Sequence, residues 1–296
     1  SSALLNFTLG KCYFELGQIE LAIASCQKAT ELKPELAVGF ILLGQIHSSQ
    51  GNQDQTIENL KKALQIEPVN HELYSTLGVE LLQKGNFDEA IKYLKKALKQ
   101  NPNSGSAISM IGDAYNQKGN HSLAIKYLNK AIKLDPNNAI SYFSMGSAQH
   151  YNGDYKAAID NYKKAIKVKP NYAEAYSNLG NVQRDKGNLD AAIKSFKKSI
   201  IIEPNCAATH FNMGITLEGK GDLQLAIESY EKAVKINPNY TAAYRDLGPS
   251  PIGKGDSKLE IKIFKKAIKF QPNYAEIFNN LGVAQKNIGD LEAAID

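Results

Sequence analysis

The 296-residue sequence is built on a period of 34 residues, and this period constrains the fold more than any other feature. Eight of the ten prolines form one ladder at this spacing, from Pro34 to Pro272. Two glycine ladders, Gly10 to Gly282 and Gly17 to Gly289, and one isoleucine ladder, Ile23 to Ile295, keep the same spacing. A fixed period of this length is typical of a solenoid, in which each repeated unit packs only on its neighbours.

Each copy, for example residues 173–206, is predicted to form two helices joined by a tight turn. Helical spacing of apolar residues runs without a breaker as far as Gly187, which can adopt the left-handed conformation that ends a helix. Asn188 follows as the expected cap of the second helix. Gly180 and Ala192 are small, and we expect them to let the two helix backbones approach closely.

The residues at fixed places in each copy resemble the tetratricopeptide repeat family. In the copy at 173–206 these residues are Tyr176, Leu179, Gly180, Ala192, Phe196, Ser199 and Pro204. The resemblance covers the whole chain. With Asn before the Leu-Gly pair, the repeats are also similar to those of O-linked N-acetylglucosamine transferases and related bacterial repeat proteins. The resemblance implies an all-α fold, an α-solenoid that forms a right-handed superhelix of 34-residue helix-turn-helix repeats.

We therefore expect a single solenoid over 1–296. Its repeats are predicted at 3–36, 37–70, 71–104, 105–138, 139–172, 173–206, 207–240, 241–274 (degenerate) and 275–296 (truncated). In the degenerate repeat, Pro249 and Pro251 fall inside the expected first helix, where a proline costs about 3 kcal/mol. That helix is predicted to end near Leu247, with 261–270 still helical. The repeat is either a hinge or a decayed copy, and the truncated repeat suggests a piece of a longer array.

Composition and motif spacing favour a protein without catalytic or metal chemistry. The five histidines include no pair at i, i+4 spacing, so we expect no metal and no cofactor. No nucleophile, base and acid can be assigned to one face of one unit, so an enzyme is not predicted. The segment 248–255 resembles a phosphate-binding loop but has Gly255 where the loop needs Ser or Thr. Cys12, Cys26 and Cys206 are predicted to be small packed thiols in a reducing compartment.

The charge pattern argues against nucleic acid and membrane partners. The formal charge is only +5, and lysine pairs such as Lys61-Lys62 recur on the second helices. They read as a solvated ridge, although an anionic partner would also suit them. Acidic residues interrupt the ridge, and no aromatic residues alternate with it as base stacking would need. No apolar run reaches the roughly 20 residues that span a bilayer, and no signal peptide opens the chain, so we expect a cytoplasmic location.

The family resemblance implies a concave groove lined by positions 2, 5, 9 and 12 of each first helix, with position 6 at its edge. Asn178, Asn212 and Asn280 occupy position 6, and Asp246 interrupts their ladder. An amide offers a donor and an acceptor, which suits the backbone of an extended peptide. The alternative is that each Asn is bonded to its own helix. Further candidates are apolar contacts at Leu4, Phe7, Val38 and Ile41, aromatic anchors at Phe143 and Phe211, and polar contacts at Asn181, Arg184 and Arg245.

The leading hypothesis is a non-enzymatic scaffold that binds an extended peptide or protein segment in this groove. The family's clamp on a peptide's terminal carboxylate is not predicted, because Asn181 has Ser177 where the clamp needs Lys. One alternative is the substrate-targeting arm of a larger glycosyl- or sulfotransferase. Another is head-to-tail self-association of the repeats. The residues do not identify the ligand.

Overall fold

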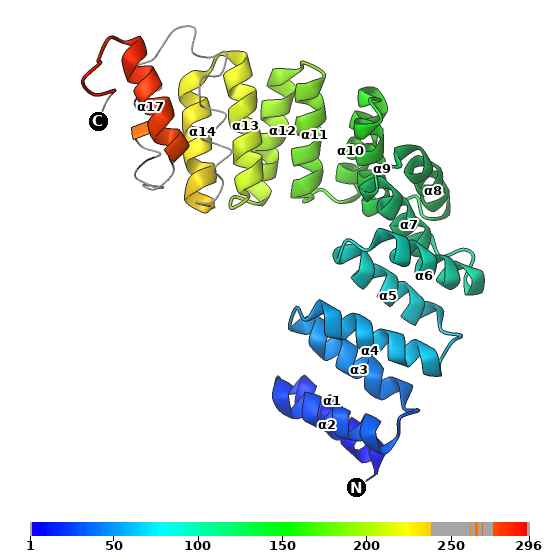
Figure 1. The fold of residues 1–296 in the computed structure, drawn as a ribbon. Helices are drawn as coiled ribbons and strands as arrows, with labels where there is room; N and C mark the ends of the chain where they lie inside the picture. The colour runs from blue at the N-terminus through cyan, green and yellow to red at the C-terminus, as the bar shows by residue number, and fades with distance from the viewer. Residues whose placement is uncertain (1, 238–260, 262–263, 266–267, 269–274, 295–296) are drawn as a thin grey trace. The chain divides into compact units, whose positions relative to one another are not determined.

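The computed structural model describes residues 2–237, 261, 264–265, 268 and 275–294, and its regular elements within these ranges are all helices (Figure 1). The chain divides into two compact units, Ser1–Asn152 (unit 1) and Gly153–Asp296 (unit 2). We describe each unit by itself. The fold is an all-α helical repeat, as the sequence predicts.

Unit 1 contains four helix pairs and the first helix of a fifth pair, in chain order. They are α1 (Ala3–Glu15), α2 (Ile19–Leu32), α3 (Ala37–Ser49), α4 (Gln53–Ile66), α5 (His71–Gln83), α6 (Phe87–Gln100), α7 (Gly105–Gln117), α8 (His121–Leu134) and α9 (Ala139–Tyr151). Each helix packs mainly on the next helix along the chain, and α1, α5 and α7 also meet the next first helix, respectively α3, α7 and α9. The first helices begin 34 residues apart, so the sequence period is the structural period.

Unit 2 continues with the same spacing. Its described helices are α10 (Tyr155–Val168), α11 (Ala173–Asp185), α12 (Leu189–Ile202), α13 (Ala207–Lys220), α14 (Leu223–Ile236) and α17 (Ala275–Asn287). Residues 261, 264–265 and 268 are also helical. The predicted helix end near Leu247, the proline pair and the remainder of 261–270 lie outside the described residues.

Glycine makes the turn inside each described hairpin. Gly187 has φ +85°, in the left-handed region that glycine adopts without a steric penalty. The equivalent glycines at 17, 51, 85, 119, 153, 221 and 289 have φ between +73° and +91°. The predicted turn is therefore confirmed at every described copy.

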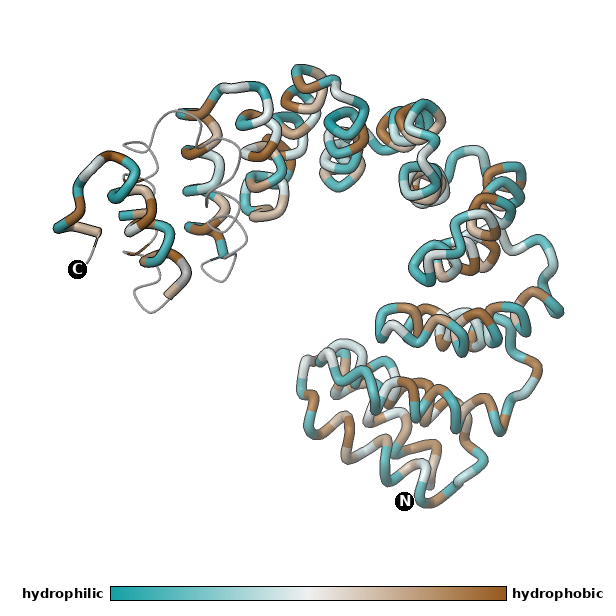
Figure 2. The backbone as a smooth tube through the Cα atoms, turned by 45° about the horizontal axis from the view of Figure 1, so that its top comes forward, coloured by the Kyte–Doolittle hydropathy of each residue, from teal (hydrophilic) through white to brown (hydrophobic). Residues whose placement is uncertain are grey.

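The two helices of a hairpin approach closely where the sequence places its small residues. A Cβ added to Gly180 would lie 2.6 Å from Cε1 of Phe196, and the Phe196 ring is fully buried. Ala192 is also fully buried. Brown hydrophobic and teal hydrophilic stretches alternate along the described helices in Figure 2, as expected for helices buried on one face. The predicted reason for the small residues is confirmed.

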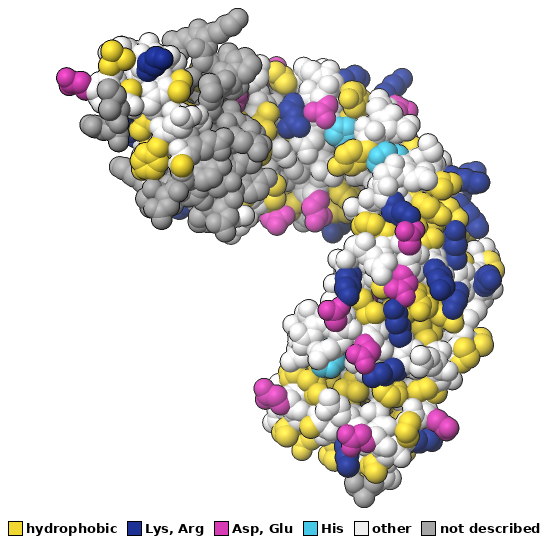
Figure 3. All heavy atoms as spheres, viewed as in Figure 1, with side chains coloured by type: hydrophobic (Ala, Val, Ile, Leu, Met, Phe, Trp, Pro, Cys, Tyr) yellow, Lys and Arg dark blue, Asp and Glu magenta, His cyan; other side chains and the backbone are white. Residues whose placement is uncertain are grey.

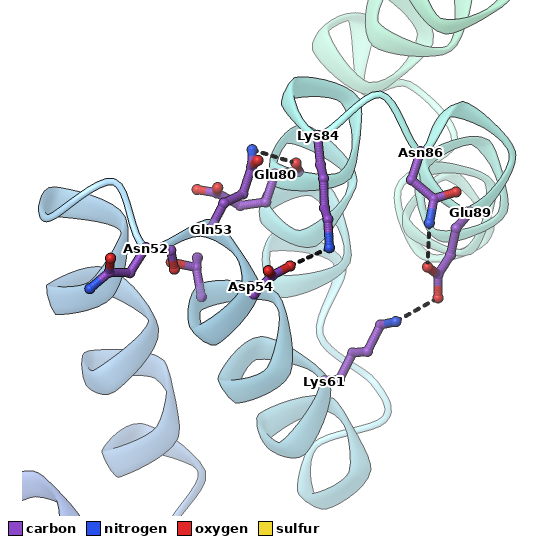
Figure 4. Close-up of polar contacts among 9 residues, drawn as sticks. Asn52, Gln53, Asp54, Lys61, Glu80, Lys84, Asn86 and Glu89 are labelled. Carbon is purple, nitrogen blue, oxygen red and sulfur yellow. Dashed lines mark hydrogen bonds and ion pairs between the residues drawn. The ribbon is translucent and has the colours of Figure 1, made fainter.

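Polar side chains join α4 to the next repeat along the chain (Figure 4). Lys84, at the end of α5, forms an ion pair with Asp54 of α4. Nζ of Lys61 in α4 lies 2.7 Å from Oε1 of Glu89 in α6. Nε2 of Gln53 donates to the carbonyl oxygen of Glu80 at 3.1 Å. These contacts join α4 to the following hairpin, and each exposed pair stabilises by only about 0.2–1 kcal/mol.

Two sequence expectations need correction. Asn188 stands at the N-cap of α12, but its side chain forms no capping hydrogen bond there. In the same position, Asn120 and Asp154 do accept from the backbone N–H three residues on. Cys26 is buried as expected, whereas Cys12 is exposed.

Candidate peptide-binding face

The first helices of the first two repeats form a groove of about 410 Å³ in unit 1. Its lining residues are Phe7, Lys11, Phe14, Glu15, Val38, Ile41, Leu42 and Gln45, all from α1 and α3. They occupy positions 2, 5, 6, 9, 12 and 13 of their repeats, which include the predicted binding stripe. Phe7, Val38 and Ile41 therefore lie together as expected, whereas Leu4 is exposed and does not line the groove. We call the surface made by these positions of the first helices the first-helix face.

Further along unit 1, side-chain hydrogen bonds join α7 to α9 on and beside the first-helix face. Oγ of Ser141 donates to Oγ of Ser109 at 2.9 Å, and this pair is buried. Oγ of Ser144 donates to Oδ1 of Asp113 at 3.3 Å. Burial raises the pKa of the Asp113 carboxyl above its usual value, and the Ser144 hydrogen bond partly opposes this rise. Sequence reasoning missed Asp113, although it is the only acidic residue at position 9 in the nine repeats.

In unit 2, α11 carries two polar atoms on the first-helix face that find no hydrogen-bond partner among the described residues. They are Oδ1 of Asn181 and Nη1 of Arg184, and both atoms are buried. The Arg184 side chain forms an ion pair through Nε with Oδ1 of Asp185 at 3.3 Å, which leaves Nη1 unpaired. Residues three apart lie on the same face of a helix, so the two side chains lie on one side of α11. Both residues were predicted site residues.

The predicted asparagine ladder has members with different surroundings. Asn178 in α11 and Asn212 in α13 are half-buried. Asn280 in α17 is buried, with 9% of its surface exposed. Arg245 and the interrupting Asp246 lie outside the described residues. The ladder therefore stays a prediction, with Asn178 and Asn212 as its more accessible described members.

The two predicted aromatic anchors also differ. Phe143 in α9 is half-buried on the first-helix face of unit 1. Phe211 in α13 is only 8% exposed and belongs to the hydrophobic core of unit 2. Its ring centroid lies 5.6 Å from that of Tyr230. The structure therefore gives Phe211 a packing role in the core and leaves Phe143 as the more accessible ring.

A second pocket, of about 620 Å³, lies in unit 2 at the ends of α12 and α14. Its lining residues include His210, Lys232 and Lys235. Nε2 of His210 lies 3.0 Å from the carbonyl oxygen of Pro204. At the equivalent position of an earlier repeat, Oη of Tyr74 donates to the carbonyl oxygen of Pro68. Burial is the main cause that lowers the pKa of His210. This pocket does not include the first-helix face.

The lysine pairs of the second helices are mixed with other side chains. On the face that Figure 3 shows, Lys and Arg side chains stand among acidic and hydrophobic ones and form no continuous basic patch. Lys61 and Lys62 form ion pairs with Glu89 and Glu58. Among the described residues, no group of three or more His, Cys, Asp or Glu could hold a metal ion. The described helices include none that is both long and apolar enough to cross a bilayer.

Helical hairpins repeated every 34 residues, with polar and apolar side chains exposed along one face of the first helices, define a helical-repeat interaction protein. Sequence models described as tetratricopeptide repeat match residues 3–36, 39–70, 75–139, 127–160, 171–239 and 263–296, and a TPR repeat model matches 146–184. The chain belongs to the tetratricopeptide repeat family. This membership supports a protein-interaction scaffold as its general class.

Among solved structures, the crystal structure of MamA is 34% identical to this chain, with a TM-score of 0.50. That match covers 56% of this chain and 97% of MamA. A tetratricopeptide repeat protein from Parabacteroides merdae is 16% identical, with a TM-score of 0.69, over 82% of this chain and 96% of that one. The human IFIT1 dimer with m7Gppp-AAAA is 19% identical, with a TM-score of 0.62, over 100% of this chain and 70% of that one. The last two likenesses show the fold alone. A search of curated proteins found no match.

Proposed function

We propose that the protein is a non-enzymatic scaffold that binds an extended peptide segment on the first-helix face. The observation that carries the proposal is the pair of buried, unpartnered atoms on α11, Oδ1 of Asn181 and Nη1 of Arg184. An unpaired buried polar group costs about 1–3 kcal/mol. Both side chains are half-buried, so a ligand toward which they turn, and which pairs both atoms, would be favoured. A peptide backbone supplies both partners, because its N–H donates to the amide oxygen and its carbonyl accepts from the guanidinium.

The groove between α1 and α3 supports the same function in unit 1. Its lining side chains are largely apolar, and they include the rings of Phe7 and Phe14. Ligand sites in proteins commonly combine such apolar walls with a few polar groups that fix orientation. The first-helix face therefore offers apolar contacts in unit 1 and backbone-directed polar contacts on α11.

The test is selection of a displayed random-peptide library against the full chain, followed by fluorescence polarisation with the recovered peptides. The double variant Asn181→Ala/Arg184→Ala is expected to bind them about 10- to 100-fold more weakly, because it removes one neutral and one charged hydrogen bond. The matched control is Lys197→Ala, an exposed residue on the second helix α12. Equal affinity of all three proteins would refute a role for this part of the face.

The asparagine ladder has its own test. Changing Asn178, Asn212 and Asn280 together to Ala is expected to weaken binding of the recovered peptides, and unchanged affinity would remove the ladder from the proposal. Attachment to a transferase and head-to-tail self-association stay predictions. Sedimentation velocity at several concentrations tests the second of these.

A further inference from the structure

Asp113 is a half-buried carboxylate on the first-helix face of unit 1. It lies in α7, and its one hydrogen bond within the described residues comes from the Ser144 hydroxyl of α9 at 3.3 Å. No described Lys, Arg or His forms an ion pair with it. By contrast, the exposed carboxylates of Asp54, Asp88 and Asp190 each pair with a lysine of the next repeat. Asp113 is therefore less exposed than these three carboxylates, and no described residue places a cation beside it.

The surroundings of Asp113 correspond to the groove between α1 and α3, three repeats earlier in the chain. Lys11 holds the equivalent position in that groove, and Leu42 holds the position of Ser144. The Ser144–Asp113 hydrogen bond shows that these two positions also meet between α7 and α9. Asp113 thus occupies the position that Lys11 holds in the earlier groove.

Apolar side chains occupy the neighbouring positions on α9. Ile140 and Phe143 correspond to Val38 and Ile41, which line the earlier groove. Ile140 is 61% exposed, and Phe143 is half-buried. A carboxylate beside exposed apolar surface matches a lysine or arginine side chain, whose stem is apolar and whose end is cationic.

We propose that Asp113 recognises the lysine or arginine side chain of a peptide bound on the first-helix face, with the stem of that side chain against Ile140 and Phe143. The inference rests on the proposed function and adds the chemical class of one ligand residue. Opposite charge is the reason for the choice, because withdrawing a carboxylate from water costs free energy that a paired cation offsets. A neutral or acidic ligand residue would leave the Asp113 carboxylate unpaired.

The experiment is parallel selection of one displayed random-peptide library against the wild type, Asp113→Asn and Asp54→Asn. Asn at position 113 keeps the size of the side chain and can still accept from Ser144, and circular dichroism checks that each variant is folded. Asp54 is the matched control, because it is an exposed aspartate on the second helix α4. The wild type and Asp54→Asn are expected to enrich Lys or Arg at one aligned peptide position, and Asp113→Asn is expected to lose that enrichment.

A recovered peptide is then compared with a version that carries uncharged norleucine at that position. The wild type is expected to bind the basic peptide at least about 10-fold more tightly, and Asp113→Asn is expected to bind the two about equally. Recovered peptides that bind without any preference for Lys or Arg would overturn this inference and leave the proposed function standing. A wild type that retains no peptide would overturn both.

Discussion

Replacement of Gly180 by alanine tests how tightly the repeat is packed. The new Cβ would lie 2.6 Å from Cε1, 2.8 Å from Cδ1 and 2.8 Å from Cζ of the buried Phe196 ring. Because real Cβ contacts are longer, the ring or the helix must move, and overpacking of this kind costs about 1–3 kcal/mol. Alanine also favours a helix over glycine by about 1 kcal/mol. The net change is therefore a loss of about 0–2 kcal/mol of unfolding free energy.

Gly219 is the matched control, because it also lies in a first helix, α13, and an added Cβ would meet nothing within 4 Å. Gly219→Ala should gain up to about 1 kcal/mol from helix propensity alone. The two variants are thus expected to differ by about 1–3 kcal/mol, the size of the overpacking cost. Urea unfolding followed by far-ultraviolet circular dichroism measures the difference, and amide hydrogen exchange in α11 and α12 shows whether the loss is local.

A double-mutant cycle separates the ring contact from other effects. In a Phe196→Ala background the ring is gone, so Gly180→Ala should stabilise by about 1 kcal/mol, as at an open helical site. If Gly180→Ala is as stable as Gly219→Ala in the wild-type background, the close approach of α11 and α12 does not constrain position 180. That result would refute the packing argument for the glycine ladder.

Two further predictions concern titratable groups. The pKa of His210 is lowered in the fold, so the unfolded chain binds more protons below the ordinary value of 6.5, and stability should fall as pH drops through that value. His210→Tyr should flatten this part of the profile when urea midpoints at pH 7.5 and 5.5 are compared, and an unchanged slope would contradict the assignment. Burial raises the pKa of Cys26 to about 11, so iodoacetamide at pH 8 should label exposed Cys12 in the native protein and Cys26 only after unfolding. Equal labelling rates, read by peptide mass spectrometry, would contradict it.

The sequence period predicts most of the hairpin architecture, because each ladder residue has a local backbone or packing reason. Gly187 ends its helix through its own φ, and Gly180 is small because Phe196 of the same repeat lies against it. The missing cap bond of Asn188 was less predictable, because side chains at this position have alternative partners. Nδ2 of the equivalent Asn86, for example, donates to Oε2 of Glu89 at 3.0 Å.

The candidate site was only partly predictable. The binding stripe follows from the repeat positions, and Asn181 and Arg184 were predicted site residues. Phe211 shares position 5 with Phe143, yet it packs in the core of unit 2, because its burial depends on the neighbouring Tyr230 ring. Asp113 has no cationic partner among the described residues because the adjacent repeat places Ser144 beside it. Contacts of this kind between repeats are not evident from the sequence of one repeat.

Contacts in the described helices run mainly between a helix and the next one or two along the chain, for example from α4 to α5 and from α6 to α7. Removal of residues 71–104 would connect the end of α4 to the start of α7. Because α7 is equivalent to α5, α4 would again be followed by a first helix. A gene of this kind can gain or lose a whole hairpin by recombination between copies. The protein product keeps the same kind of packing between consecutive repeats. The length of the binding surface can therefore change in evolution without a new fold.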